Sequence, residues 1–155
     1  DPKVGERFYV GGELGLMYGL GVRGTWLHSD ESGKPLLHVD AGAKSILLIN
    51  SVFAEAGYHP FGNSLFVGAR VQDTIVTDPL SGNGLLSSHR ATAGALVGAQ
   101  GPVFNQSGKG KVLLGVQGGI DYVEGSAFPY GTDTRLPLVP HLEFTLSGKV
   151  ADTGK

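Results

Sequence analysis

Charged and amide side chains recur at alternate positions in several segments of this 155-residue chain. The residues concerned are Glu13, Arg23, Asp40, Lys44, Arg70, Gln72, Gln100, Gln117, Asp121, His141 and Glu143. Both signs of charge are present in similar numbers, and a buried charge without a partner costs several kcal/mol. We therefore predict an interior network in which Glu13, Asp121 and Glu143 pair with Arg70 and Lys44. Such a network would act as a structural plug that seals the interior. The alternative is a functional interior, either a polar conduit or a pocket for a small ligand.

Histidine and serine residues offer weaker signals for metal binding or catalysis. The histidines are His28, His38, His59, His89 and His141. They form no HExxH motif and no closely spaced pair, so we expect no metal site. His141, Glu143 and Ser147 share one face of a predicted strand, but no nucleophile-elbow motif is present. The segment 107–111 (SGKGK) lacks the spacing of a phosphate-binding loop. We expect neither enzyme activity nor a cofactor, and a barrel lipid hydrolase remains an alternative.

Strands must position these polar side chains, because the polar residues alternate with apolar ones at a period of two. From Phe8 to Trp26, apolar residues fall on one face and glycine-rich polar residues on the other. Similar alternation recurs in the segments 37–44, 65–74, 91–100, 112–122 and 136–147. It is interrupted at Phe66, Leu96, Leu113 and Val139. The segment 45–58 (SILLINSVFAEAGY) loses the pattern near Asn50, and we favour two strands joined at Asn50 and Ser51 over one kinked strand or a short helix.

The number of strands decides the architecture. If 8–26 and 36–58 are single strands, the chain has six, and closure of a barrel would require an oligomer. Splitting them near residues 18–21 and at Asn50 gives eight, the smallest number usual for a single-chain membrane barrel. Runs of about ten residues are long enough to cross a bilayer as tilted strands. We predict an all-β, antiparallel up-and-down barrel of eight strands, in one domain that spans residues 1–155 and has a flexible tail from about residue 149.

Composition and the character of the two faces indicate what surrounds such a barrel. The net charge of −2 gives no basic field for nucleic acid, and charged residues make up 17% of the chain. The polar face carries Gly, Gln, Thr and Ser, whereas a solvated face usually carries dense Lys and Glu. Aromatic residues lie toward the ends of the runs, as in interfacial girdles: Phe8, Tyr9, Trp26, Tyr58, Phe61, Phe104, Tyr122 and Phe144. We predict an apolar face against lipid; the alternative is a soluble barrel that binds a small apolar ligand, with its apolar face inward.

The segment 8–16 (FYVGGELGL) resembles the opening strand of small bacterial outer-membrane β-barrel proteins of the OmpA/OmpX type, and 54–71 (AEAGYHPFGNSLFVGARV) is similar to their strand–turn–strand units. The resemblance implies a transmembrane barrel in the bacterial outer membrane. We expect a structural or surface-interaction role through the longer loops 28–35, 77–88 and 124–134. In the last loop, Phe128 and Tyr130 are candidates for contact with a surface ligand or a small molecule.

Overall fold

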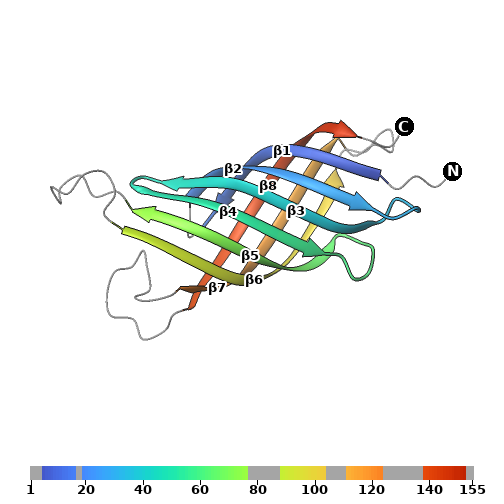
Figure 1. Cartoon of the computed structure of the whole chain (residues 1–155). Helices are drawn as coiled ribbons and strands as arrows, with labels where there is room; N and C mark the ends of the chain where they lie inside the picture. Colours follow the sequence, from blue (N-terminus) through green and yellow to red (C-terminus); the bar gives the residue numbers. More distant parts are fainter. Residues whose placement is uncertain (1–4, 17–18, 77–87, 104–110, 124–137, 153–155) are drawn as a thin grey trace.

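Eight antiparallel strands close into one barrel in the computed structural model (Figure 1). The structure describes residues 5–16, 19–76, 88–103, 111–123 and 138–152. The strands are β1 (Gly5–Gly15), β2 (Gly19–Ser29), β3 (Pro35–Ile46), β4 (Ile49–Tyr58), β5 (Leu65–Val76), β6 (Ser88–Val103), β7 (Val112–Val123) and β8 (Leu138–Asp152). Each strand pairs with its neighbours in sequence, and β8 pairs with β1. The predicted all-β, up-and-down barrel of eight strands is confirmed. The described residues include no helix long and apolar enough to span a membrane.

Both of the long segments with an uncertain strand count are hairpins. β1 ends at Gly15 and β2 begins at Gly19, whose positive φ of 81° suits a residue without a side chain. The second turn lies at Leu47 and Leu48, three residues before the predicted position at Asn50 and Ser51. The prediction was wrong because two leucines carry none of the usual turn chemistry. Once the turn is placed there, residues 51–58 alternate without interruption between buried and exposed positions.

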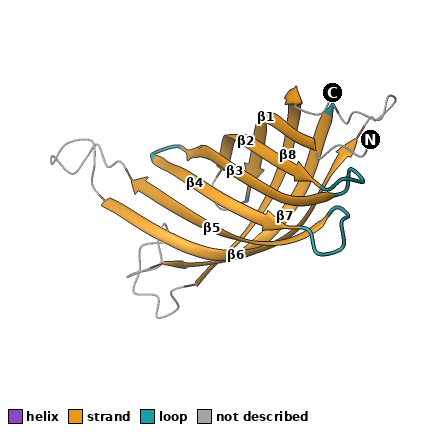
Figure 2. Ribbon diagram, turned by 45° about the vertical axis from the view of Figure 1, so that its right-hand side comes forward, coloured by secondary structure: helices purple, strands orange, loops and turns teal. Residues whose placement is uncertain are grey.

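An up-and-down barrel sends its connections to its two ends in turn. Gly5 and Asp152 lie at one end, which we call the terminal end, together with the β2–β3 and β4–β5 turns (Figures 1 and 2). Strands β5 and β7 run toward the opposite end, which we call the far end. The loops 28–35, 77–88 and 124–134 were predicted to face outward on the same side of the membrane. They do not lie at the same end of the barrel. The loop 28–35 is at the terminal end, whereas 77–88 and 124–134 follow strands that lead to the far end.

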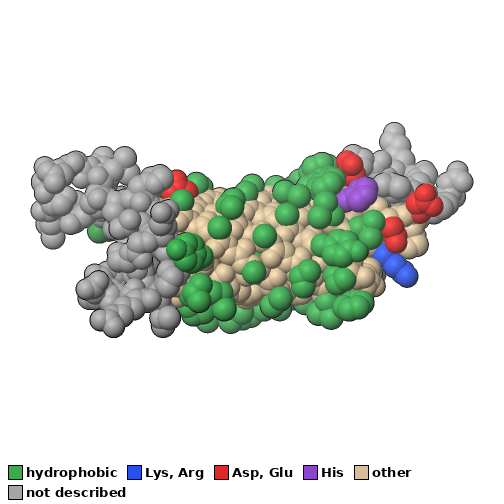
Figure 3. All heavy atoms as spheres, turned by 60° about the horizontal axis from the view of Figure 1, so that its bottom comes forward, with side chains coloured by type: hydrophobic (Ala, Val, Ile, Leu, Met, Phe, Trp, Pro, Cys, Tyr) green, Lys and Arg blue, Asp and Glu red, His purple; other side chains and the backbone are tan. Residues whose placement is uncertain are grey.

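The apolar face of the sheet is its outer face. Large aliphatic residues such as Val22 and Val97 are more than 60% exposed, while Arg23, on the same strand as Val22, is buried. Among the strand residues whose side chains the structure describes, Asp152 at the end of β8 is the only exposed one that carries a charge. In Figure 3 the charged and histidine side chains accordingly gather toward the ends of the barrel, and the flank between them shows only apolar side chains, other side chains and backbone. The alternative of an inward apolar face is therefore wrong.

The residues that interrupt the alternation in the sequence are apolar residues on the inner face. Phe66, Leu96, Leu113 and Val139 are each no more than 4% exposed. The strands thus keep their period of two throughout, and the change of residue type reflects filling of the interior. Tyr9, predicted as part of an outer aromatic girdle, also lies inside at 1% exposed and packs with Leu27 and Leu113. It points inward because Phe8 and Val10, its neighbours on β1, point outward.

The last strand continues further than the sequence indicated. Residues 149–152, expected to begin a flexible tail, belong to β8 and pair with β1, with Asp152 opposite Arg7. The Asp152 carboxylate lies 4.0 Å from the Arg7 guanidinium and 3.0 Å from the Lys149 ammonium. The closing seam of the barrel therefore extends to this point, because the backbone of β1 offers a pairing edge as far as Arg7.

Candidate functional site

The interior of the barrel brings together all the residues predicted to form a polar network. Glu13, Arg23, Lys44, Arg70, Gln72, Gln117, Asp121, His141 and Glu143 are each at most 6% exposed. Asp40 and Gln100, from the same alternating set, are buried as well. Each side chain points inward because its strand neighbours are apolar and face out. A buried network of salt bridges therefore occupies the bore of the barrel.

One half of this network centres on Arg23 of β2. Its guanidinium lies 2.6 Å from the Glu13 carboxylate on β1 and 3.3 Å from the Asp40 carboxylate on β3. It also donates to Glu55 of β4 at 2.5 Å. The Gln117 side chain reaches across from β7 and donates to both oxygens of Glu55 at 3.0 Å. A single guanidinium thus joins the carboxylates of three other strands.

The other half centres on Arg70 of β5. Its two terminal nitrogens donate to Asp121 on β7 at 2.6 Å and to Glu143 on β8 at 2.7 Å. Lys44 of β3 links the two halves, because its ammonium lies 3.1 Å from Glu13 and 3.4 Å from Glu143. The network therefore crosses the bore from wall to wall and ties together strands that are not adjacent in the sheet.

His141 of β8 lies between two carboxylates of the network. Its Nδ1 is 2.7 Å from Glu143, and its Nε2 is 3.5 Å from Asp121. The five carboxylates of the network, Glu13, Asp40, Glu55, Asp121 and Glu143, face the three basic side chains of Arg23, Lys44 and Arg70. A protonated His141 would offset part of this negative excess, and both of its ring nitrogens have a carboxylate to receive the donated hydrogen.

A second polar group, the histidine pair His38 and His59, lies toward the terminal end. His38 Nδ1 and His59 Nε2 are 2.9 Å apart, and His59 Nδ1 lies 2.8 Å from the Asn63 carbonyl oxygen. The carbonyl can only accept, so a neutral His59 donates there and accepts from His38. Burial lowers the pKa of His59 from its ordinary value, which favours this neutral form. The Phe66 ring packs edge-on against His38 at a centroid distance of 4.5 Å and helps to close this level of the bore.

Glycines on the inner face provide space for these side chains. A Cβ atom on Gly57 would lie 2.1 Å from His38 Cε1. On Gly94 it would lie 2.2 Å from the Asp121 carboxylate. Because real Cβ atoms do not approach other atoms so closely, a larger residue at either position would displace a buried polar group. The glycine-rich inner face is therefore the complement of the long charged side chains opposite it.

Among the charged and histidine side chains that the structure describes, sequence reasoning missed Glu55, His38 and His59 as members of the interior. Glu55 was missed because the turn before β4 was misplaced, which hid the alternation of residues 51–57. With the turn at Leu47 and Leu48, that alternation alone would have identified Glu55. The predicted loop contacts Phe128 and Tyr130 lie outside the described residues.

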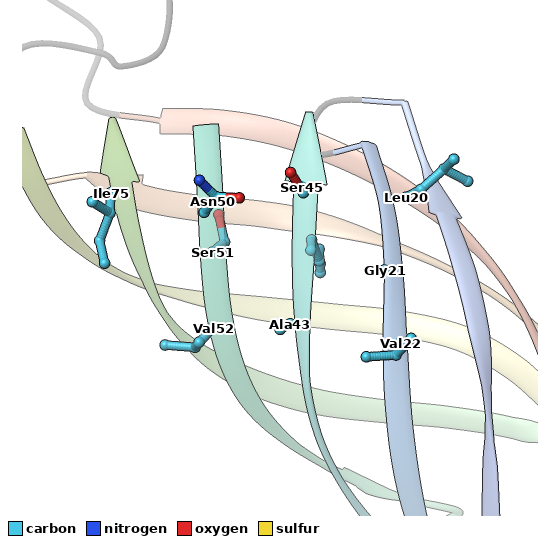
Figure 4. Close-up of a pocket in the computed structure, with 10 residues that line it drawn as sticks. Leu20, Gly21, Val22, Ala43, Ser45, Asn50, Ser51, Val52 and Ile75 are labelled. Atoms are coloured by element: carbon cyan, nitrogen blue, oxygen red, sulfur yellow. The ribbon is translucent and has the colours of Figure 1, made fainter. Parts of the chain in front are cut away.

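The outer wall of the barrel carries shallow apolar grooves. One of about 440 Å³ near the far end has Ala43 on its floor, with Val22 on one side and Val52 on the other (Figure 4). Leu20 and Ile75 continue its walls toward the rim.

In the part of the chain that the structure describes, no three His, Asp or Glu side chains form a group able to hold a metal ion. The arrangement of the interior is that of a charged plug.

Comparison of the chain with protein-family models, with curated protein sequences and with solved structures found no match. The architecture agrees with the barrel that the resemblance to small outer-membrane proteins implied. The distribution of charged and exposed side chains in the barrel is therefore the basis for a functional assignment.

Proposed function

We propose that this chain is a transmembrane β-barrel of a bacterial outer membrane. The observation that carries the proposal is the inverted distribution of polarity. Apart from Asn50 and Asp152 at strand ends, the exposed strand positions that the structure describes are apolar, aromatic or small. By contrast, eleven charged or histidine side chains are buried in the interior: Glu13, Arg23, His38, Asp40, Lys44, Glu55, His59, Arg70, Asp121, His141 and Glu143. In water this outer surface would be a large unpaired apolar patch, and in a bilayer it is matched to its solvent.

The exposed aromatic residues support the same assignment. Phe8 and Tyr58 project from the wall near the terminal end, and Tyr122 projects near the far end. Aromatic side chains are enriched at both membrane–water interfaces, where an amphipathic ring meets the headgroups. Strands of ten to sixteen residues are long enough to join two such levels.

The role proposed for the barrel is structural or surface-interacting rather than catalytic or pore-forming. Arg23, Lys44 and Arg70 join carboxylates on opposite walls, so the bore is occupied at the level where a pore would need open space. The ring of His141 is engaged by two carboxylates, which suits a structural role better than that of a catalytic base beside Ser147. The segments that follow β5 and β7 at the far end are the proposed contact regions.

Insertion into a membrane is the first test of this function. The protein is expected to require detergent for extraction, and its folded form should migrate differently from the heated form on a gel in detergent. Val97→Lys places a charge on the outer wall, so it should reduce folding into vesicles. Glu31→Lys in the exposed β2–β3 turn is the matched control and should fold normally. A monodisperse protein without detergent would overturn the proposal.

Conductance then separates a plug from a pore. The folded protein in a planar bilayer should show no steady conductance, because ion pairs span its bore. Sustained single-channel currents in the unmodified protein would contradict the sealed interior while leaving the membrane assignment standing.

A further inference from the structure

The tip of the β3–β4 hairpin is built from aliphatic residues alone. Ile46, Leu47, Leu48 and Ile49 follow one another there. Leu47 is 92% exposed and Leu48 is 49% exposed. Tight turns at the surface usually contain Gly, Asn or Asp, because those residues tolerate the backbone and interact with water. This turn therefore exposes leucine side chains, which are poorly suited to contact with water.

The backbone at the same tip is strained. Leu47 has a φ of 52°, in the left-handed region that a residue with a branched side chain rarely occupies. Asn or Gly would relieve this strain and would also be better hydrated. Backbone strain at an exposed position is informative when no contact within the protein explains the residue that bears it. An environment that rewards an exposed leucine would explain this one.

Exposed leucines also flank the neighbouring turn. Leu16 and Leu20 flank the β1–β2 turn and are 66% and 67% exposed. Below the two tips, the groove lined by Leu20, Ala43 and Val52 continues the apolar surface down the outer wall (Figure 4). The apolar belt of the barrel thus continues to the rim on this side, interrupted only by the exposed, uncharged pair Ser45 and Asn50, which lie opposite each other on β3 and β4.

The β2–β3 turn at the terminal end differs sharply from these tips. The β2–β3 turn carries the exposed Glu31, Ser32 and Lys34, and the Asp30 carboxylate accepts hydrogen bonds from backbone nitrogens within it. Hydrogen bonds from Ser32 and Lys34 hold the pKa of Asp30 below its ordinary value, so the turn carries its charge in water. A short turn in this barrel is therefore not apolar by necessity.

We propose that the tip of the β3–β4 hairpin, together with Leu16 and Leu20 of the neighbouring hairpin, is immersed in the acyl chains of the lipid leaflet at the far end, so that this side of the rim ends inside the bilayer. The inference rests on the proposed membrane location. Transfer of the leucines at the tips from water to hydrocarbon offsets the strain at Leu47. Acyl chains are the occupant that the surface fits, because the tip lies directly beyond the lipid-facing wall and only the uncharged pair Ser45 and Asn50 stands between them.

Tryptophan fluorescence tests this depth. In a Trp26→Phe background, where no other tryptophan remains, single tryptophans are introduced by Leu47→Trp, Leu48→Trp, Val22→Trp and Glu31→Trp. Each variant is folded into phosphatidylcholine vesicles that contain lipids brominated on the acyl chains, and iodide is added from the aqueous phase. Val22→Trp lies on the outer wall and tests the membrane location itself. Leu48→Trp duplicates the test at a position where the structure shows no positive φ.

The expected result is that the tryptophans at positions 47, 48 and 22 lose most of their fluorescence to brominated lipid and resist iodide. Glu31→Trp should behave in the opposite way. If position 22 is quenched by lipid but 47 and 48 are quenched by iodide, the immersion of the tips is wrong and the membrane location stands. If position 22 is not quenched by lipid, both proposals fail. If positions 47 and 48 are shielded from both quenchers, a protein contact covers the tips and the lipid assignment is overturned.

Discussion

Asp40 on β3 and Glu55 on β4 are directly opposite each other, and both carboxylates face into the barrel. Two like charges in this position repel, and their burial removes the screening that water would provide. Arg23 contacts both of them, at 3.3 Å and 2.5 Å respectively. One guanidinium from β2 therefore holds two carboxylates that would otherwise separate β3 from β4.

The two carboxylates should respond differently to neutralisation. Asp40→Asn removes the repulsion while leaving Arg23 its contacts with Glu13 and Glu55, so the free energy of unfolding should change by no more than about 1 kcal/mol. Glu55→Gln weakens the acceptor shared by Arg23 and Gln117 and should cost about 1–3 kcal/mol. Denaturant unfolding in detergent measures both. A larger loss for Asp40→Asn than for Glu55→Gln would contradict this assignment.

Arg70 should be among the most sensitive positions of the interior. Arg70→Ala leaves the carboxylates of Asp121 and Glu143 buried without their guanidinium, which should lower the free energy of unfolding by about 3–5 kcal/mol. Arg7→Ala is the matched control, because its partner Asp152 is 4.0 Å away and both side chains are partly exposed. That loss should stay below about 1 kcal/mol. Unchanged thermal stability of Arg70→Ala would count against a structural network.

The fit of the histidine pair against β4 predicts a steric effect. Gly57→Ala would place a methyl group 2.1 Å from the His38 ring, so the ring or the strand must move. The expected loss is about 1–3 kcal/mol, as for other overpacked interiors. Gly24→Ala is the control, since its Cβ would lie 3.9 Å from the nearest atom. Thermal unfolding followed by the shift on a gel compares the two, and equal midpoints would show that the pair is loosely packed.

His59 should make stability depend on pH. Burial lowers its pKa below the ordinary value of 6.5, so the folded protein binds the proton less tightly than the unfolded chain does. Its contribution to stability is therefore complete above pH 6.5 and declines as the pH falls below that value. Unfolding midpoints between pH 8 and pH 5, measured for the unmodified protein and for His59→Gln, should diverge because the variant loses this part of the slope. Parallel curves would exclude His59 as the source.

Alternation in the sequence was enough to predict the barrel and the residues inside it. A period of two assigns each side chain to one face whatever the neighbouring strands are, so Arg23, Arg70 and Glu143 could be placed inside without knowledge of their partners. Glu55 was lost for a local reason. The turn at Leu47 and Leu48 has an aliphatic sequence, and a misplaced turn shifts the face assigned to every residue after it.

Only the tertiary structure decided which residues meet. The contact of Lys44 with Glu143 joins β3 to β8, and it depends on closure of the sheet and on the register of every strand between them. The end at which each loop emerges depends likewise on the count of strands before it. By itself the sequence determined the two faces of each strand, because side-chain direction is a property of the local backbone. The partners across the bore were decided by closure, because the distance between two inward side chains is set by the whole ring of strands.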